Sequence, residues 1–173
     1  MEIKMTNYNV LPRRAGTRPP TTPWMPHMQI DFKPDPEIKA ELFRRIYSLP
    51  DVRNEPTRIS IPGARAIWLR EDLPLAHGEV ILEGREFAHI HPDASFHVTL
   101  SPQRAREAIE AEWAEYHPLA SQIGIEGMVL LYTPRDMQEL DVIFQLVVDS
   151  YNFVTGRALH PTDILSVIAT GEK

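Results

Sequence analysis

The chain has 173 residues, of which 43% are hydrophobic and none is cysteine, and its formal net charge at pH 7 is −6. This length is typical of one domain with its own hydrophobic core. The lack of cysteine excludes disulfides, thiolate nucleophiles and cysteine-ligated metals, so any bound metal must be held by histidine and carboxylate side chains. The negative charge disfavours nucleic-acid binding, despite Arg13, Arg14 and Arg18 near the N-terminus.

No apolar run approaches the roughly 18 residues that a membrane-spanning helix requires. Residues 1–8 lack the basic and apolar regions of a signal peptide. We therefore expect a cytoplasmic protein without a membrane partner.

Proline is dense between Leu11 and Pro36, which disfavours regular helices and interior strands there. The same segment contains apolar side chains such as Trp24 and Met28, too many for a solvated tail. We expect residues 1–34 to form an extended arm that packs across the domain of residues 35–173 or against a second subunit of a homodimer.

The first predicted elements are a helix and two strands. Asp35 followed by Pro36 is typical of a helix start, and apolar residues at helical spacing then continue to Leu49. Residues 58–61 and 64–69 have strand character on either side of a Pro-Gly turn.

The middle of the chain predicts a hairpin followed by a helix. Residues 80–82 and 85–91 continue the strand pattern, and residues 96–100 are expected to return antiparallel to the latter. Ser101 and Pro102 then begin a helix that we expect to end near His117, where a helix C-terminus favours a protonated imidazole.

The last part predicts a buried strand over 128–132 and a long helix. Thr133 and Asp136 have the spacing of a capping box, and apolar residues in steps of three and four then continue to Gly156. Residues 164–168 are expected to form a last strand or a helical turn. This order lacks the strict alternation of a parallel sheet, so we predict an α+β fold: an antiparallel sheet with helices packed on one face.

Three of the seven histidines lie within the predicted hairpin. Side chains alternate along a strand, so His89 and His91 share one face, as do Ser95, His97 and Thr99. Pairing His91 with His97 puts all five on one polar face and keeps the apolar residues together, which burial favours.

Glu86 would then lie on the apolar face, unless a bulge redirects its side chain. Clustered neutral imidazoles suit three tasks: binding a divalent metal, moving protons near neutral pH, or stabilising an anionic oxygen. A solvated polar face without a role is the fourth interpretation, and the residue pattern leaves all four open.

Four segments in order resemble the luciferase-domain family, which contains fungal luciferases and bacterial homologues. They are Arg85-Glu-Phe-Ala-His-Ile-His91, Phe96-His-Val-Thr-Leu100, Trp113-Ala-Glu-Tyr-His-Pro-Leu-Ala120 and Leu131-Tyr-Thr-Pro-Arg-Asp136. The resemblance implies an oxygenase that needs no cofactor and uses molecular oxygen on a small enolic substrate, in the family a hydroxypyrone such as 3-hydroxyhispidin.

With this resemblance, we expect His89 and His91 to act as base and oxyanion stabiliser and His97 and His117 to orient them. Glu86 would fix an imidazole tautomer. The remaining predicted site residues are expected to contact the substrate: Tyr132 and Arg135 near an acidic group, with Trp113, Ser95 and Thr99. If a metal is bound, its expected ligands are His89, His91 and His97.

Two other classes compete with the enzyme. A non-catalytic module would hold a metal or a small acidic ligand on the same face. A purely structural protein would instead use the arm and the helix around Met137 for interactions, and its histidines would have no role.

Overall fold

The structure is a computed structural model and describes residues 7–171. Its helices are α1 (Pro36–Ile46), α2 (Pro102–Glu110), α3 (Met137–Thr155) and α4 (Pro161–Thr170), with a short 3-10 turn, η1 (Gly78–Val80). Its strands are β1 (Val52–Pro56), β2 (Arg65–Leu69), β3 (Glu86–Ile90), β4 (Phe96–Thr99), β5 (Ala114–Tyr116) and β6 (Met128–Leu131). No helix in this described part is both long and apolar enough to span a membrane.

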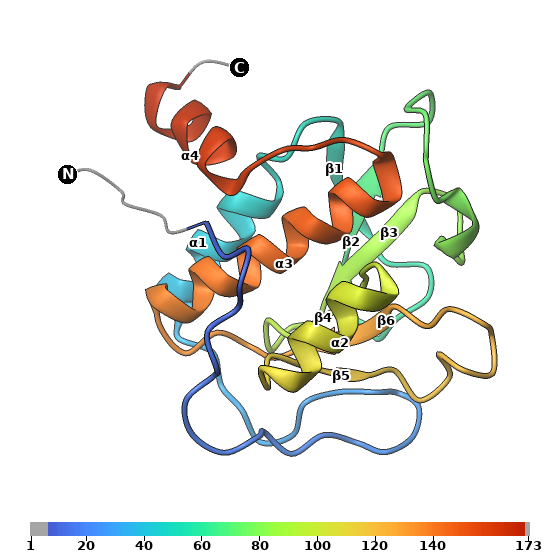
Figure 1. The fold of residues 1–173 in the computed structure, drawn as a ribbon, viewed down its shortest axis with the longest axis vertical. Coiled ribbons are helices and arrows are strands. Elements are labelled where there is room, and N and C mark those ends of the chain that lie inside the picture. Colours follow the sequence, from blue (N-terminus) through green and yellow to red (C-terminus); the bar gives the residue numbers. More distant parts are fainter. Residues whose placement is uncertain (1–6, 172–173) are drawn as a thin grey trace.

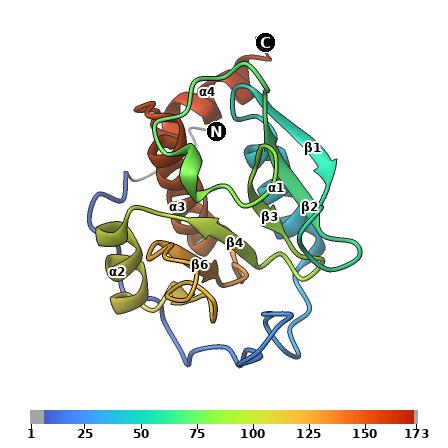
Figure 2. The ribbon, with the colours of Figure 1, turned by 90° about the vertical axis from the view of Figure 1, so that its right-hand side faces the viewer.

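The strands form one antiparallel sheet in the order β1-β2-β3-β4-β6-β5. Helix α3 crosses one face of the sheet, and α1 packs beside it (Figure 1). Helix α4 lies against α1 and α3, at the end of this layer (Figure 2). The predicted α+β class is therefore confirmed. The main core lies between this helical layer and the sheet, where Ile90, Phe96 and Val98 point toward α3.

The two predicted Pro-containing helix starts are confirmed. Asp35 accepts hydrogen bonds from the backbone N–H groups of the first turn of α1, and Ser101 does the same in α2. The predicted start of α3 at Thr133 is wrong, because the capping residue is Asp136, which accepts from the N–H of Glu139. Thr133 instead donates its hydroxyl to the carbonyl of Asp93.

Helix α2 ends at Glu110, seven residues before the predicted end at His117. Glu112 adopts a left-handed φ of 66°, which turns the chain out of the helix. The next residues form the edge strand β5, paired with β6. His117 therefore follows a strand, and the expected effect of a helix C-terminus on its charge does not apply.

Two predicted strands are also wrong. Residues 58–61 form bends and the strand lies earlier, at β1, while residues 80–82 belong to η1 and the bend after it. The Glu86 carboxylate accepts hydrogen bonds from the backbone of Arg58 and the hydroxyl of Thr57, so this segment is tied to a side chain of β3 and not to a strand backbone. Residues 164–168, expected to form a last strand or a helical turn, lie within helix α4.

The predicted pairing of β3 and β4 is displaced by two residues. His97 lies opposite His89, and the His91 N–H donates to the Ser95 carbonyl at the hairpin end. Because side chains repeat every two residues, a shift by two leaves each on its predicted face. His89, His91, His97 and Thr99 accordingly lie on the sheet face opposite α3.

The N-terminal segment lies against its own chain, one of the two arrangements expected for the arm. It runs beside β5 (Figure 1), where the Arg14 N–H donates to the Ala111 carbonyl and the Trp113 indole N–H donates to the Pro12 carbonyl. Thr21 and Gln29 then pair as an isolated antiparallel bridge. The loop between them brings His27 over the sheet face that carries the other histidines.

The turn of the histidine hairpin contains a strained residue. Ala94 is buried and has a φ of 65°, a left-handed conformation that costs a residue with a Cβ roughly 1 kcal/mol. We predict that Ala94→Gly is neutral or stabilises the protein by up to about 1 kcal/mol, whereas Ala108→Gly inside α2 destabilises it by about 1 kcal/mol. Urea unfolding of both variants checks this, and a clear loss of stability in Ala94→Gly would contradict it.

Candidate functional site

A cavity of about 550 Å³ opens on the sheet face opposite α3. Five buried histidines contribute to its wall: His27, His89, His91, His97 and His117. Apolar side chains form much of the remainder, and four of them are exposed at its edge: Met25, Ile59, Leu82 and Ile123. The cavity therefore combines an apolar mouth with a polar floor.

The floor follows from one row of side chains across the sheet. In the strand register, Glu115 of β5 lies opposite Leu130 of β6, which lies opposite His97 of β4, which lies opposite His89 of β3. Neighbouring strands are about 4.8 Å apart, so Glu115 and His97 are too distant for direct contact. His27 from the arm bridges this gap.

The bridge completes a chain of polar contacts between two carboxylates. His27 Nε2 lies 2.6 Å from Glu115 Oε1, and its Nδ1 lies 3.2 Å from His97 Nε2. His97 Nδ1 lies 3.0 Å from His89 Nε2, and His89 Nδ1 lies 3.2 Å from Glu86 Oε1. Three imidazoles are thus connected in series, with a buried carboxylate at each end.

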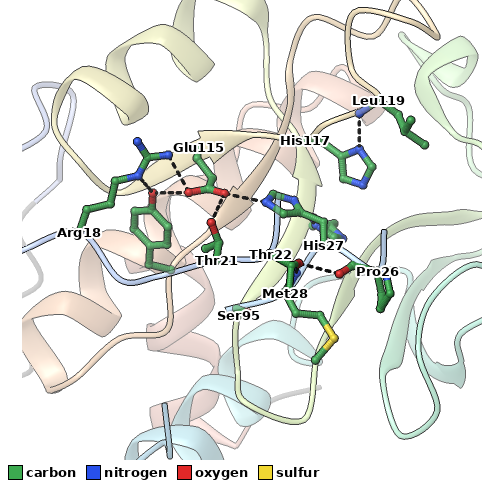
Figure 3. A network of polar contacts seen from close by, with 12 residues as sticks. Arg18, Thr21, Thr22, Pro26, His27, Met28, Ser95, Glu115, His117 and Leu119 are labelled. Carbon is green, nitrogen blue, oxygen red and sulfur yellow. Dashed lines mark hydrogen bonds and ion pairs between the residues drawn. The ribbon is translucent and has the colours of Figure 1, made fainter. Parts of the chain in front are cut away.

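Glu115 joins the arm to the sheet (Figure 3). Besides His27, its carboxylate accepts hydrogen bonds from Arg18, from the Thr21 hydroxyl and from the Tyr132 hydroxyl. Burial raises the pKa of Glu115, but these hydrogen bonds outweigh burial and bring the pKa to about 2. The carboxylate is therefore ionised, and it accepts a hydrogen bond from the Nε2–H of His27.

At the other end, a bulge in the pairing of β2 and β3 redirects Glu86. Ala88 pairs with Ile67, but Glu86 pairs with Trp68, which adds one residue to β3 and turns the carboxylate toward His89. Burial raises the pKa of Glu86, but hydrogen bonds from His89, Arg58 and Thr57 outweigh it and leave the pKa below its usual value. Glu86 therefore accepts the Nδ1–H of His89, the tautomer role expected for it.

The partners of two other histidines also fix their tautomers. The Ser95 hydroxyl donates to Asp93, so it accepts the Nδ1–H of His91, 2.9 Å away. His117 Nδ1 accepts the N–H of Leu119 (Figure 3), so the proton of a neutral His117 is on Nε2. His91 therefore has a lone pair on Nε2, whereas His117 is an N–H donor there.

Burial keeps His91, His97 and His117 uncharged at neutral pH. It lowers the pKa of His91 to about 3 and that of His117 to about 4, and the nearby imidazoles lower both further. The pKa of His97 lies well below its usual value for the same reasons. Neutral imidazoles are the form that binds a metal.

Two groups of histidines have the spacing of a metal site. One is His27, His97 and His117, and the other is the predicted group, His89, His91 and His97. In each group the candidate ligand atoms lie within 4.8 Å of one another. They share His97.

The structure brings some of the predicted site residues together and separates others. Those that line the cavity are Glu86, His89, His91, His97, Thr99 and His117. Ser95 lies one contact away, through His91, and Tyr132 lies two contacts away, through Glu115 and His27.

Trp113 and Arg135 do not line this cavity but a second, shallower depression. The Arg135 guanidinium pairs with Glu139 and the Ala15 carbonyl. Neither residue is therefore placed to contact a ligand on the histidine face.

Sequence reasoning missed His27 and Glu115. His27 is far from the hairpin in the chain, in a Pro-rich segment without strand periodicity. A signal was present, since the arm is too apolar for a tail and contains this histidine. Glu115 stands within the motif that begins at Trp113, but the expected helix concealed that it belongs to a strand beside the site.

We predict that Glu115→Ala lowers the free energy of unfolding by about 2–4 kcal/mol, because it leaves buried partners unsatisfied and releases the arm. Glu112→Ala is the control. Glu112 pairs with the exposed Arg13, and such surface pairs contribute at most about 1 kcal/mol. Denaturant unfolding and limited proteolysis of the arm test this, and equal effects of the two substitutions would contradict it.

Comparisons with known proteins agree with this geometry. The luciferase domain family matches residues 84–150, which contain β3, β4, β5, β6 and most of α3. A protein described as "Luciferase" from Armillaria gallica is 30% identical over 167 residues, covering 84% of this chain and 61% of that relative. The chain thus spans about three fifths of that protein's length.

No solved structure was found to match the chain. The domain match covers four of the five cavity histidines, and only His27 of the arm lies outside it. The resemblance predicted from the four motifs is confirmed: residues 84–150 match the luciferase domain family, and the chain is similar to a fungal luciferase.

Proposed function

We propose that this protein is an oxygenase that combines molecular oxygen with a small enolic substrate of the hydroxypyrone type, bound in the histidine-lined cavity. The observation that supports it most is the cavity itself: histidines held in defined orientations on one side and apolar side chains on the other. The similarity to the Armillaria luciferase supports the reaction class.

The cavity suits a planar, largely apolar molecule with one acidic hydroxyl. Its volume of about 550 Å³ lies within the usual range for small-molecule sites. Met25, Ile59 and Leu82 at the mouth would cover the apolar part of such a substrate. The hydroxyl would then reach the histidine floor.

In this proposal the enolic proton passes to Nε2 of His89. The ionised Glu86 accepts the Nδ1–H of His89 and stabilises the imidazolium that forms. The resulting anion is electron-rich, and its carbon forms a bond with oxygen to give a peroxide. No organic cofactor is needed, because the substrate anion supplies the electrons.

Tautomers modify the roles expected for two histidines. His91 directs its N–H to Ser95 and presents a lone pair on Nε2, so it is not suited to stabilising an oxyanion. His117 carries its proton on Nε2 and lines the cavity. We therefore assign the stabilisation of the substrate anion to His117 and an orienting role to His91.

The alternative is a non-catalytic module that binds a metal or a small acidic ligand. For the acidic ligand, the cavity offers little, since no lysine or arginine of the described residues lines it. Arg135, the cation expected to bind such a group, lies outside the cavity. A metal is the better supported ligand for such a module, because two histidine groups have suitable spacing.

The test is oxygen uptake by the untagged protein with 3-hydroxyhispidin and simpler hydroxypyrones, with photon counting in the same cell. We predict substrate-dependent uptake that His89→Ala lowers at least about 100-fold, the scale of a lost general base. The substitution also removes the partner of the buried Glu86 and lowers the melting temperature, so uptake is compared at a temperature at which circular dichroism shows both proteins folded. His77→Ala is the control, because His77 is half-exposed and pairs with Glu79 outside the cavity.

Light is not required for the proposal to hold. Absence of uptake with every hydroxypyrone would contradict the oxygenase and favour the binding module. Full uptake by His89→Ala would reject His89 as the base.

A further inference from the structure

We propose that His89, His91 and His97 form a binding site for one divalent transition-metal ion, whose fourth position opens into the cavity. This inference rests on the geometry of the histidines and not on the oxygenase proposal. It selects one of the two histidine groups and adds the residues that orient its ligands.

The first argument is the direction of the ring nitrogens along the chain of contacts. Four contacts connect Glu86, His89, His97, His27 and Glu115. The Glu86 carboxylate faces His89 Nδ1, so His89 Nε2 is directed away from it, toward His97.

His97 offers the second nitrogen. Its Nε2 faces His27 Nδ1, and its Nδ1 faces His89 Nε2 at a distance of 3.0 Å. A metal ion held by His89 and His97 would bind these two facing nitrogens.

His91 offers the third ligand nitrogen. Its Nδ1–H is directed to Ser95, which leaves Nε2 for a ligand. The rings of His89 and His97 have their centres 5.3 and 4.8 Å from that of His91. Tetrahedral coordination with metal–nitrogen bonds of about 2.0–2.1 Å needs nitrogens about 3.3–3.4 Å apart. The His89–His97 pair is close to this spacing already, and the candidate ligand atoms of all three histidines lie within 4.8 Å of one another.

The outer nitrogen of each proposed ligand leads to a carboxylate. His89 donates to Glu86 directly, His91 reaches Asp93 through Ser95, and His97 reaches Glu115 through His27. Such carboxylate–histidine pairs orient the rings of metal ligands and increase their basicity. In the structure, the outer nitrogen of each of the three proposed ligands has such a partner.

Charge gives an independent argument. The Glu86 side chain has no exposed surface, and among the described residues its only ion-pair partner is His89. Its other hydrogen bonds come from a hydroxyl and a backbone N–H. Oδ2 of Asp93 is buried without any hydrogen-bond partner. A carboxylate behind His89 and an unpartnered carboxylate oxygen behind His91 both favour a cation on the ligand side of these rings.

The second histidine group lacks these properties. His117 accepts the Leu119 N–H on Nδ1, so its other nitrogen carries the proton and cannot ligate. In His27, both ring nitrogens already have partners, Glu115 at Nε2 and His97 at Nδ1. His27 therefore orients His97, and His117 donates an N–H. Of this group, only His97 is a ligand.

Three neutral imidazoles favour zinc, iron, nickel or copper over magnesium or calcium. An ion here would change one step of the oxygenase proposal. The enolic oxygen would bind the ion, and His89 Nε2 would no longer be the proton acceptor. The two proposals can therefore fail separately.

The test uses untagged full-length protein stripped of metals with a chelator. Calorimetric titration with ZnCl₂ is expected to give one ion per chain, and CoCl₂ is expected to give the visible absorption bands of a tetrahedral site. His89→Ala, His91→Ala and His97→Ala should each weaken zinc binding at least about 100-fold. Glu86→Gln should weaken it about 10- to 100-fold, the usual effect of a lost outer partner.

The control variants are His117→Ala and His77→Ala, which should both bind zinc within about threefold of the unchanged protein. Thermal melts of each variant identify any that fail to fold. The stoichiometry and cobalt spectrum of the unchanged chain decide whether a tetrahedral site exists, and the variants decide which histidines form it.

No binding of either ion by the folded protein at millimolar concentration would overturn the proposal. Binding that survives in His91→Ala and is lost in His117→Ala would also overturn it, because it would move the site to the other group. Oxygen uptake on the same samples separates the two proposals. Metal binding without uptake supports this site and rejects the oxygenase, whereas uptake by a chain unable to bind metal does the reverse.

Discussion

The site depends on a single constraint: imidazoles buried on one face of the sheet need hydrogen-bond partners from the protein behind them. His27 and His91 are almost fully buried, so bulk solvent can satisfy little of their hydrogen-bonding capacity. The protein meets this constraint with ionised carboxylates placed behind the histidines, Glu86 at one end and Glu115 at the other. Unpartnered polar groups at these positions would each destabilise the fold by about 1–3 kcal/mol.

The same contacts connect folding with the site. Glu115 holds His27, Thr21 and Arg18 of the arm, so the contacts that fix the arm also complete the cavity wall. On the opposite side, the bulge that turns Glu86 toward His89 also fixes the segment around Thr57, next to the cavity lining at Ile59. The orientation of the histidines is therefore a property of the whole sheet face and not of the hairpin alone.

Much of this was predictable from local patterns. Alternation along the hairpin placed His89, His91 and His97 on one face, and the prediction held although the register differs by two residues. Helix starts with Asp or Ser before Pro were found correctly at α1 and α2. The rest required contacts between distant parts of the chain. No local pattern shows that an arm histidine bridges to Glu115, nor that the segment after α2 is drawn into an edge strand by pairing with β6.

The central claim is that each histidine of the site has one fixed tautomer, set by the group behind it. Nitrogen-15 NMR of the imidazole side chains at neutral pH and in the absence of metal measures this directly. The account predicts Nδ1–H for His89 and His91 and Nε2–H for His27 and His117, with slow exchange of these protons. Averaged shifts typical of solvated imidazoles, or the opposite tautomer at His89 or His117, would contradict it.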